Sequence, residues 1–81
     1  MMYLHLGADV VVSMKQLVMI LDLKTADAAE ASRQFIERLP QRMKVTDISD
    51  GEPKSLVLTD KEAFFSPISS LTLKRRADLG L

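Results

Sequence analysis

The chain opens with alternating apolar and polar residues. Over residues 2–6, two leucines share one face of an extended segment, while Tyr3 and His5 share the other. This period of two is typical of a strand that is buried on one side only. Gly7 then begins a tight turn that leads into three consecutive valines, and β-branched residues favour strands. The pattern therefore predicts two short strands that turn at Gly7.

Two segments are apolar without alternation. Residues 10–12 are all valine and residues 18–21 read Val-Met-Ile-Leu, so neither segment has a polar face. Strands of this kind need cover on both faces. Ser13 follows the first segment and is predicted to cap one helical or 3₁₀ turn. We therefore expect Lys15 and Gln16 to project from a rigid, exposed corner.

A helix is predicted for residues 26–39. Thr25 is a suitable N-cap, acidic residues follow in the first turn where they suit the helix dipole, and Pro40 disfavours helical geometry at the preceding residue. Apolar residues recur at spacings of three and four, as on one face of an amphipathic helix. The predicted buried stripe consists of Ala28, Ala31 or Ser32, Phe35, Ile36 and Leu39.

Further strands are predicted in the second half of the chain. Asp50-Gly51 lies between the strand candidates at residues 44–48 and 55–58, and an Asp-Gly pair in that position indicates a β-hairpin. Pro53 has no N–H group to donate, so the returning strand is expected to begin after it. Residues 63–66 resume the strand pattern after a polar break.

The C-terminal segment is predicted to form a short helix. Ser69 or Ser70 is its expected N-cap, and Gly80 marks its expected end. Three cations fall in its last turns, where they suit the negative end of the helix dipole.

Two stretches of the chain repeat one pattern. Residues 11–19 and residues 57–65 both read as a strand, a hydroxyl residue, three mainly polar positions and a second strand. The repetition indicates either a common type of turn or a duplicated structure. Both interpretations predict two similar corners.

Length and composition limit the class of protein. Eighty-one residues, 47% of them apolar, suit one ordered domain over residues 1–81. The predicted fold class is α+β, with a small, mostly antiparallel sheet, one main amphipathic helix and a short C-terminal helix. There is no signal-peptide pattern, and the apolar run at residues 17–21 is too short to cross a bilayer. We therefore expect a cytoplasmic protein without a membrane partner.

The residues that usually carry catalysis are sparse. The chain has no cysteine, and His5, its one histidine, has no neighbouring carboxylate or serine at motif spacing. The aspartates do not fall at metal-loop or paired-carboxylate spacing, and no glycine-rich phosphate loop is present. We therefore expect no enzyme activity, no metal site and no cofactor.

Basic residues are the remaining candidates for a binding site. The densest cluster is Lys74-Arg75-Arg76, which is also explained as the solvated end of a helix. Lys15 and Lys54 are single cations beside predicted turns. In an oligomer the same cations recur in every copy, so contacts with phosphate add up.

Two considerations favour self-association. Several predicted strands lack a polar face, and one amphipathic helix with a short tail is a small cover for both faces of a sheet. A symmetric oligomer would supply the missing cover. The alternative is that the two helices suffice and the protein stays monomeric.

The sequence also resembles a known family of small bacterial proteins. Segments shared with it are Leu4-His5-Leu6-Gly7, Val11-Val12-Ser13, Asp50-Gly51, Lys54-Ser55-Leu56-Val57, Ser66-Pro67 and the stretch from Ser70 to Arg76. Together they resemble the RemA/RemB family of extracellular-matrix regulators, and the RemB branch most. The resemblance implies a DNA-binding transcriptional regulator of biofilm-matrix genes that forms homo-oligomeric rings, with a protomer similar to LytTR DNA-binding domains.

The sequence departs from the RemA pattern where that branch contacts DNA. Gln16, Glu52 and Pro53 stand where the RemA pattern has arginines. Lys15 and Lys54 lie one position away and could contact phosphate, without the bidentate fit of arginine. We therefore expect weaker, mostly sequence-independent DNA binding. The alternative is a protein-interaction module that has lost most DNA binding and works with a paralogue.

Overall fold

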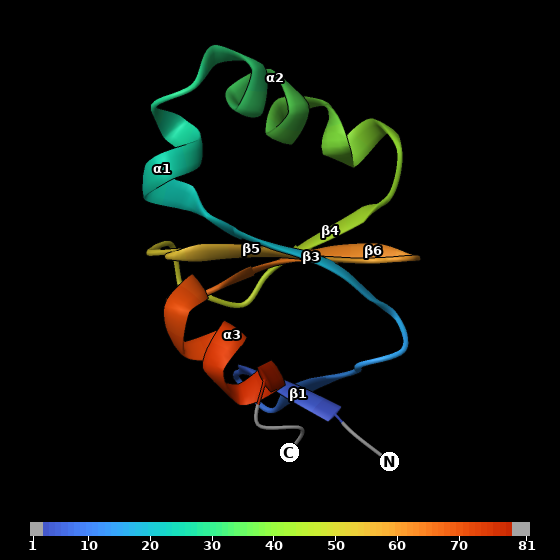
Figure 1. Cartoon of the computed structure of the whole chain (residues 1–81). Helices are drawn as coiled ribbons and strands as arrows, with labels where there is room; N and C mark the ends of the chain where they lie inside the picture. The colour runs from blue at the N-terminus through green and yellow to red at the C-terminus, as the bar shows by residue number, and fades with distance from the viewer. Residues whose placement is uncertain (1–2, 79–81) are drawn as a thin grey trace.

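The protein is a three-layered α+β structure. A computed structural model describes residues 3–78. A four-stranded sheet forms the middle layer, with α1 (Leu23–Asp27) and α2 (Glu30–Arg38) on one face and a two-stranded hairpin with α3 (Ser70–Asp78) on the other (Figure 1). The predicted α+β class is confirmed, although the strands form two sheets and not one.

The N-terminal hairpin consists of β1 (Tyr3–Gly7) and β2 (Val10–Ser13), which pair antiparallel. The two leucines of β1 are buried, and Tyr3 and His5 are exposed, as the alternation predicts. Gly7, Ala8 and Asp9 have φ values of 108°, 49° and 62°, so the tight turn is made in the left-handed region. The strand and the turn at Gly7 are therefore confirmed.

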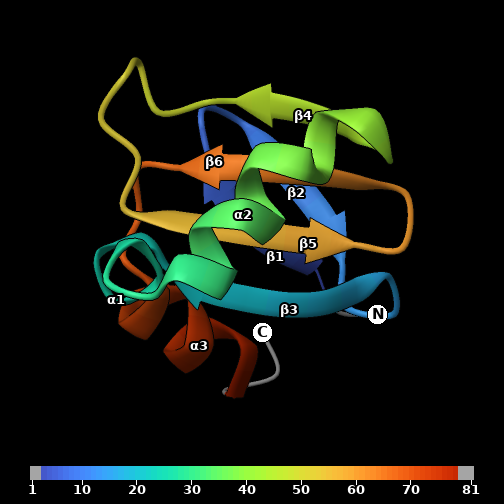
Figure 2. The same ribbon diagram turned by 90° about the horizontal axis from the view of Figure 1, so that it is seen from above.

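The middle sheet has the strand order β3-β5-β6-β4. Its strands are β3 (Leu17–Asp22), β4 (Lys44–Asp47), β5 (Ser55–Thr59) and β6 (Glu62–Ser66). The pairs β3–β5 and β5–β6 are antiparallel, and β4 pairs parallel with β6. Every residue of β5 is buried, so this strand occupies an interior position that is covered on both faces (Figure 2).

The predicted hairpin between β4 and β5 is wrong. A turn does form at Asp50 and Gly51, whose φ values are 57° and 87°, and the Glu52 N–H donates to the Ser49 carbonyl over 3.3 Å. The chain then crosses to β5, while β6 takes the place beside β4. The reason is burial: the ends of β4 are exposed and suit an edge, whereas β5 needs a neighbour and cover on every side.

The prediction of one continuous helix over residues 26–39 is also wrong. Asp22, and not Thr25, caps the first helix, because its carboxylate accepts the Lys24 N–H over 3.0 Å and the Thr25 hydroxyl over 3.1 Å. Ala29 is extended (φ −114°, ψ 127°) and separates α1 from α2. The α-helical geometry ends before Pro40, as predicted, and continues as a 3₁₀ turn over Leu39–Gln41.

The middle sheet carries a hydrophobic core on each face. Val57 and Phe64 contact the hairpin and α3 on one side, and Leu56 and Leu58 contact the layer formed by the other helices on the opposite side. The first core contains Leu4, Leu6, Val12, Val57, Phe64 and Leu73. The second contains Leu39, Leu56, Leu58 and Ala63.

Helix α3 begins as predicted. The Ser69 hydroxyl accepts the Thr72 N–H over 3.2 Å, so Ser69 is the N-cap. The predicted end near Gly80 lies outside the described residues. Within residues 3–78, no helix is long and apolar enough to cross a bilayer.

Large apolar side chains remain at the surface after these layers have formed. Val18 and Met19 on β3 are 65% and 44% exposed, and Phe35 on α2 is 42% exposed. The apolar strand β3 is therefore only partly covered. This agrees with the expectation that the two helices are a small cover for strands without a polar face.

Candidate nucleic-acid interface

The first corner presents Lys15 from a rigid turn between β2 and β3. The Ser13 hydroxyl accepts the Lys15 N–H over 3.2 Å, and the Gln16 N–H donates to the Ser13 carbonyl over 3.0 Å. The turn is hydrogen-bonded but is not a helix. Lys15 is exposed and Gln16 is half-buried, so the corner aims only the lysine fully at solvent.

A second corner of the same design joins β5 to β6. The Thr59 hydroxyl accepts the N–H groups of Lys61 (3.2 Å) and Glu62 (3.0 Å). The Asp60 N–H donates to the Gln16 carbonyl over 3.0 Å, so the two corners are bonded to each other. The prediction of two similar corners is confirmed.

Lys61 is a cation that the sequence prediction of the site omitted. It is exposed on the second corner, next to the corner that carries Lys15. The internal repetition in the sequence could have indicated Lys61, because it aligns Lys61 with Lys15: each lysine lies two positions after the hydroxyl residue. These two cations are positioned by the same kind of turn, and we add Lys61 to the candidate interface.

Lys54 lies immediately before β5 and has a fixed backbone. Its N–H donates to the Ser66 carbonyl over 2.8 Å, and its carbonyl accepts the Leu23 N–H over 3.2 Å. The side chain is exposed, as are those of Glu52 and Pro53. The segment therefore presents one anion, Glu52, and one cation, Lys54, to solvent.

One copy of the chain does not bring Lys15 and Lys54 together. Lys15 precedes the Leu17–Thr59 end of the β3–β5 ladder, and Lys54 precedes the Asp22–Ser55 end. Four residue steps along β5, or five along the irregular β3, at about 3.3 Å each place these ends roughly 13–17 Å apart. A DNA surface that uses both lysines must span this distance or combine cations from different copies.

The basic cluster of α3 lies below the middle sheet. Lys74, Arg75 and Arg76 are all exposed. The Arg76 guanidinium donates to the His5 carbonyl over 3.1 Å, so part of its hydrogen-bonding capacity already connects α3 to β1. Arg76 thus has a structural contact that Lys74 and Arg75 lack among the described residues.

Asp47, at the end of β4, accepts two hydrogen bonds from Ser49. Hydrogen bonds from the Ser49 hydroxyl and N–H lower the pKa of Asp47, with burial acting weakly in the opposite direction. Within residues 3–78 there is no group of three or more histidine, acidic or cysteine side chains placed to hold a metal ion.

Comparison with known proteins identifies the family. Residues 3–77 match the family described as RemA-like, or extracellular matrix regulatory protein A-like. The chain belongs to the RemA-like family. It is also 43% identical over 76 residues to extracellular matrix regulatory protein B of Bacillus subtilis (strain 168), a match that covers 94% of this chain and 90% of that protein. The resemblance to the RemA/RemB family is confirmed.

Proposed function

We propose that this RemA-like protein is a cytoplasmic, DNA-binding transcriptional regulator of extracellular-matrix genes that acts as a homo-oligomeric ring. The observation that carries the proposal is its family membership across residues 3–77, together with a relative named as an extracellular matrix regulator. The protein has no enzymatic activity or cofactor in this proposal. Its partners are DNA and further copies of itself.

The exposed cations support a phosphate-directed mode of binding. Lys15 and Lys54 are held on hydrogen-bonded turns, so their side chains leave defined positions on the backbone. A lysine ammonium acts on a phosphate as a point charge and reads no base sequence. The formal charge of the chain is zero, so binding depends on the sorting of these cations onto one surface of the ring.

The central test is a titration with a short duplex at about 50 mM and about 200 mM salt. We expect binding at the lower concentration and a steep loss at the higher one. Absence of binding even at low salt would reject the DNA-binding proposal.

The substitution Lys54→Glu tests the assigned interaction with phosphate. It should weaken DNA binding and reduce the slope of log K against log salt by about 0.9 for each phosphate that is no longer neutralised, while the native mass stays unchanged. Lys44→Glu is the matched control, because Lys44 is exposed on the edge strand β4 and lies outside the candidate interface. Loss of assembly in Lys54→Glu would instead give Lys54 a structural role.

A second candidate function is a protein-interaction module that works with a paralogue. Gln16, Glu52 and Pro53 favour it, because none of them can replace an arginine contact with DNA. Co-purification with an arginine-bearing paralogue, combined with no DNA binding by this chain alone, would support this function over the first.

A further inference from the structure

A hollow of about 200 Å³ lies on one side of α2, beside the 3₁₀ turn that follows the helix. We call it the Phe35 hollow. Leu39, which is 2% exposed, is its most deeply buried residue, and Phe35 is 42% exposed. The other residues that line it are Ala31, Gln34, Arg38 and Arg42. The hollow therefore combines an accessible aromatic ring with two guanidinium groups.

Helical spacing places the ring and the cations side by side. Ala31, Phe35 and Arg38 are separated by four and three positions, and residues at these spacings have Cβ atoms about 5–6 Å apart on one side of a helix. The Arg42 N–H donates to the Leu39 carbonyl over 2.9 Å, so the 3₁₀ turn fixes the backbone of the second arginine. Both guanidinium groups thus leave from hydrogen-bonded backbone.

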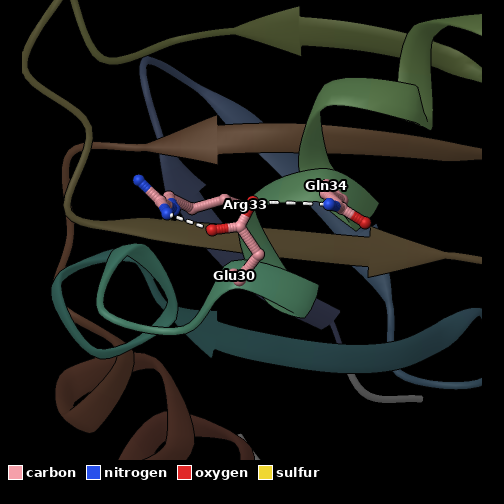
Figure 3. A network of polar contacts seen from close by, with 3 residues as sticks. All are labelled: Glu30, Arg33 and Gln34. Atoms are coloured by element: carbon pink, nitrogen blue, oxygen red, sulfur yellow. Dashed lines mark hydrogen bonds and ion pairs between the residues drawn. The ribbon is translucent and has the colours of Figure 1, made fainter.

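The charge of the Phe35 hollow is positive. Among the described residues, no acidic side chain lines it, and neither Arg38 nor Arg42 has an ion pair. The Glu30 carboxylate is 2.7 Å from the Arg33 guanidinium and accepts a hydrogen bond from Gln34 over 3.4 Å (Figure 3). The charge of Glu30 is therefore matched by Arg33, and the two arginines of the hollow are left for an external anion.

A larger cleft lacks this selectivity. It measures about 830 Å³ and opens between α1, α2 and the start of α3, where Lys54 lines it. Lys24 and Lys54 are accompanied there by Asp27 and Glu37. Such a mixture of charges favours neither anions nor cations, whereas the Phe35 hollow favours anions.

The chemistry of the Phe35 hollow fits a ligand that joins a flat ring to a phosphate. Guanidinium groups bind phosphate oxygens in pairs of parallel hydrogen bonds, and an aromatic face stacks a nucleobase. Pockets that enclose a drug-sized ligand measure roughly 300–1,000 Å³, so a hollow of this size takes one ring system and leaves the charged remainder at its rim. The Gln34 carbonyl oxygen accepts no hydrogen bond within residues 3–78 and can accept one from the amino group of a base.

We propose that the Phe35 hollow binds a nucleoside phosphate, with the base stacked on Phe35 and the phosphate held by Arg38 and Arg42. The amide of Gln34 favours a base with an amino group, such as adenine. None of the cations assigned to the DNA interface lines this hollow, so the site is separate from that interface. Its occupation requires neither the ring nor DNA.

Calorimetric titration of the whole protein with adenosine monophosphate, without DNA, is the first test. We expect a Kd between about 10 μM and 1 mM, as suits a small ligand in an open site. Adenosine and inorganic phosphate, which each lack one half of the ligand, should bind at least about tenfold more weakly. No binding of adenosine monophosphate at about 5 mM, or equal binding of inorganic phosphate, would overturn the proposal.

Substitutions of exposed residues locate the site. Phe35→Ala, Arg38→Gln and Arg42→Gln should each weaken binding of adenosine monophosphate at least about tenfold, and circular dichroism checks that each variant is folded. Arg33→Gln is the matched control, because it removes a cation of the same helix that does not line the hollow. Its affinity should stay within about twofold. Equal losses in Arg33→Gln and Arg38→Gln would contradict the assigned site.

Phe35→Trp tests the stacking directly. The chain has no tryptophan, so the new indole is the sole source of tryptophan fluorescence. Stacking is retained in this variant, and adenosine monophosphate should quench the fluorescence with the same Kd that calorimetry gives. Binding that leaves the fluorescence unchanged would show that the base does not lie against residue 35.

A free nucleotide and a nucleotide within a single strand carry the same chemistry. Tighter binding of a short single strand than of adenosine monophosphate would assign the strand as the source, and equal or weaker binding would assign the free nucleotide. The bases of a duplex are stacked on one another, so Phe35→Ala should leave duplex binding unchanged. A parallel loss of duplex binding would place the hollow in the DNA surface and overturn a separate site. Failure of the duplex to bind at all would reject the proposed regulator and leave this result standing.

Discussion

Ser66 joins the layers of the protein, and its replacement by alanine should destabilise the fold. The residue is fully buried on β6, and its hydroxyl donates to the Leu6 carbonyl over 2.7 Å and accepts the Ile68 N–H over 3.1 Å. Leu6 falls at the irregularity of the β1–β2 ladder, where the register skips from His5 to Gly7. The Ser66 hydroxyl therefore donates a hydrogen bond to the carbonyl of a residue that has no partner in the register of the β1–β2 ladder.

The expected magnitude follows from the groups that Ser66→Ala leaves without a partner. A buried polar group that loses its hydrogen bond costs about 1–3 kcal/mol, and here a buried carbonyl and a half-buried N–H are affected. We expect a loss of about 2–3 kcal/mol in the free energy of unfolding. A chain of this length has a total of roughly 4–12 kcal/mol, so Tm should fall by about 10–20 °C.

Urea denaturation followed by far-UV circular dichroism measures the effect, with protein concentration held constant because association shifts apparent stability. Ser70→Ala is the matched control. Ser70 is half-buried at the start of α3, its hydroxyl makes no hydrogen bond within residues 3–78, and its loss should change stability by less than about 0.5 kcal/mol. A loss below about 1 kcal/mol in Ser66→Ala would refute the reasoning that this hydroxyl holds the hairpin on the sheet.

Two further predictions concern local geometry and pH. Gly7→Ala should destabilise the protein by about 1–3 kcal/mol and by more than Gly51→Ala: both residues have positive φ, but only at Gly7 would a Cβ lie 3.1 Å from Pro67. Equal losses in urea denaturation would contradict the role of Pro67. The lowered pKa of Asp47 means that its stabilising contribution is present above the ordinary value of 3.8 and is lost as pH falls through the lowered value. Asp47→Asn should therefore be less stable than the unmodified protein near neutral pH, and the difference in Tm should vanish in acid; a difference that persists unchanged would contradict this assignment.

The local elements of this protein are determined by short stretches of sequence. The alternation around Tyr3 and His5, the turn at Gly7, the Ser69 cap and the corner that holds Lys15 each depend on residues within about four positions of one another. Propensity, capping and turn geometry act over that range. The same local rule, repeated at Thr59, places Lys61 on the matching corner.

Strand order depends on interactions that no short segment contains. Asp50-Gly51 does form its turn, but the complete burial of β5 places that strand between β3 and β6 and sends β4 to the edge. The early start of the first helix is a local effect by contrast, because the carboxylate of Asp22 caps it through Lys24 and Thr25. Strand order is decided by where each strand finds cover in the sheet.

The candidate interface also has a part that the sequence determines and a part that only the tertiary structure determines. Its cations and their turns follow from the sequence, since a hydroxyl side chain and its neighbouring N–H groups suffice to build each corner. The separation of Lys15 from Lys54 follows only from the β3–β5 register, and the cleft beside Lys54 only from the meeting of three helices. Hydrogen bonds between near neighbours are specified locally, whereas the placement of surfaces requires the whole sheet to assemble.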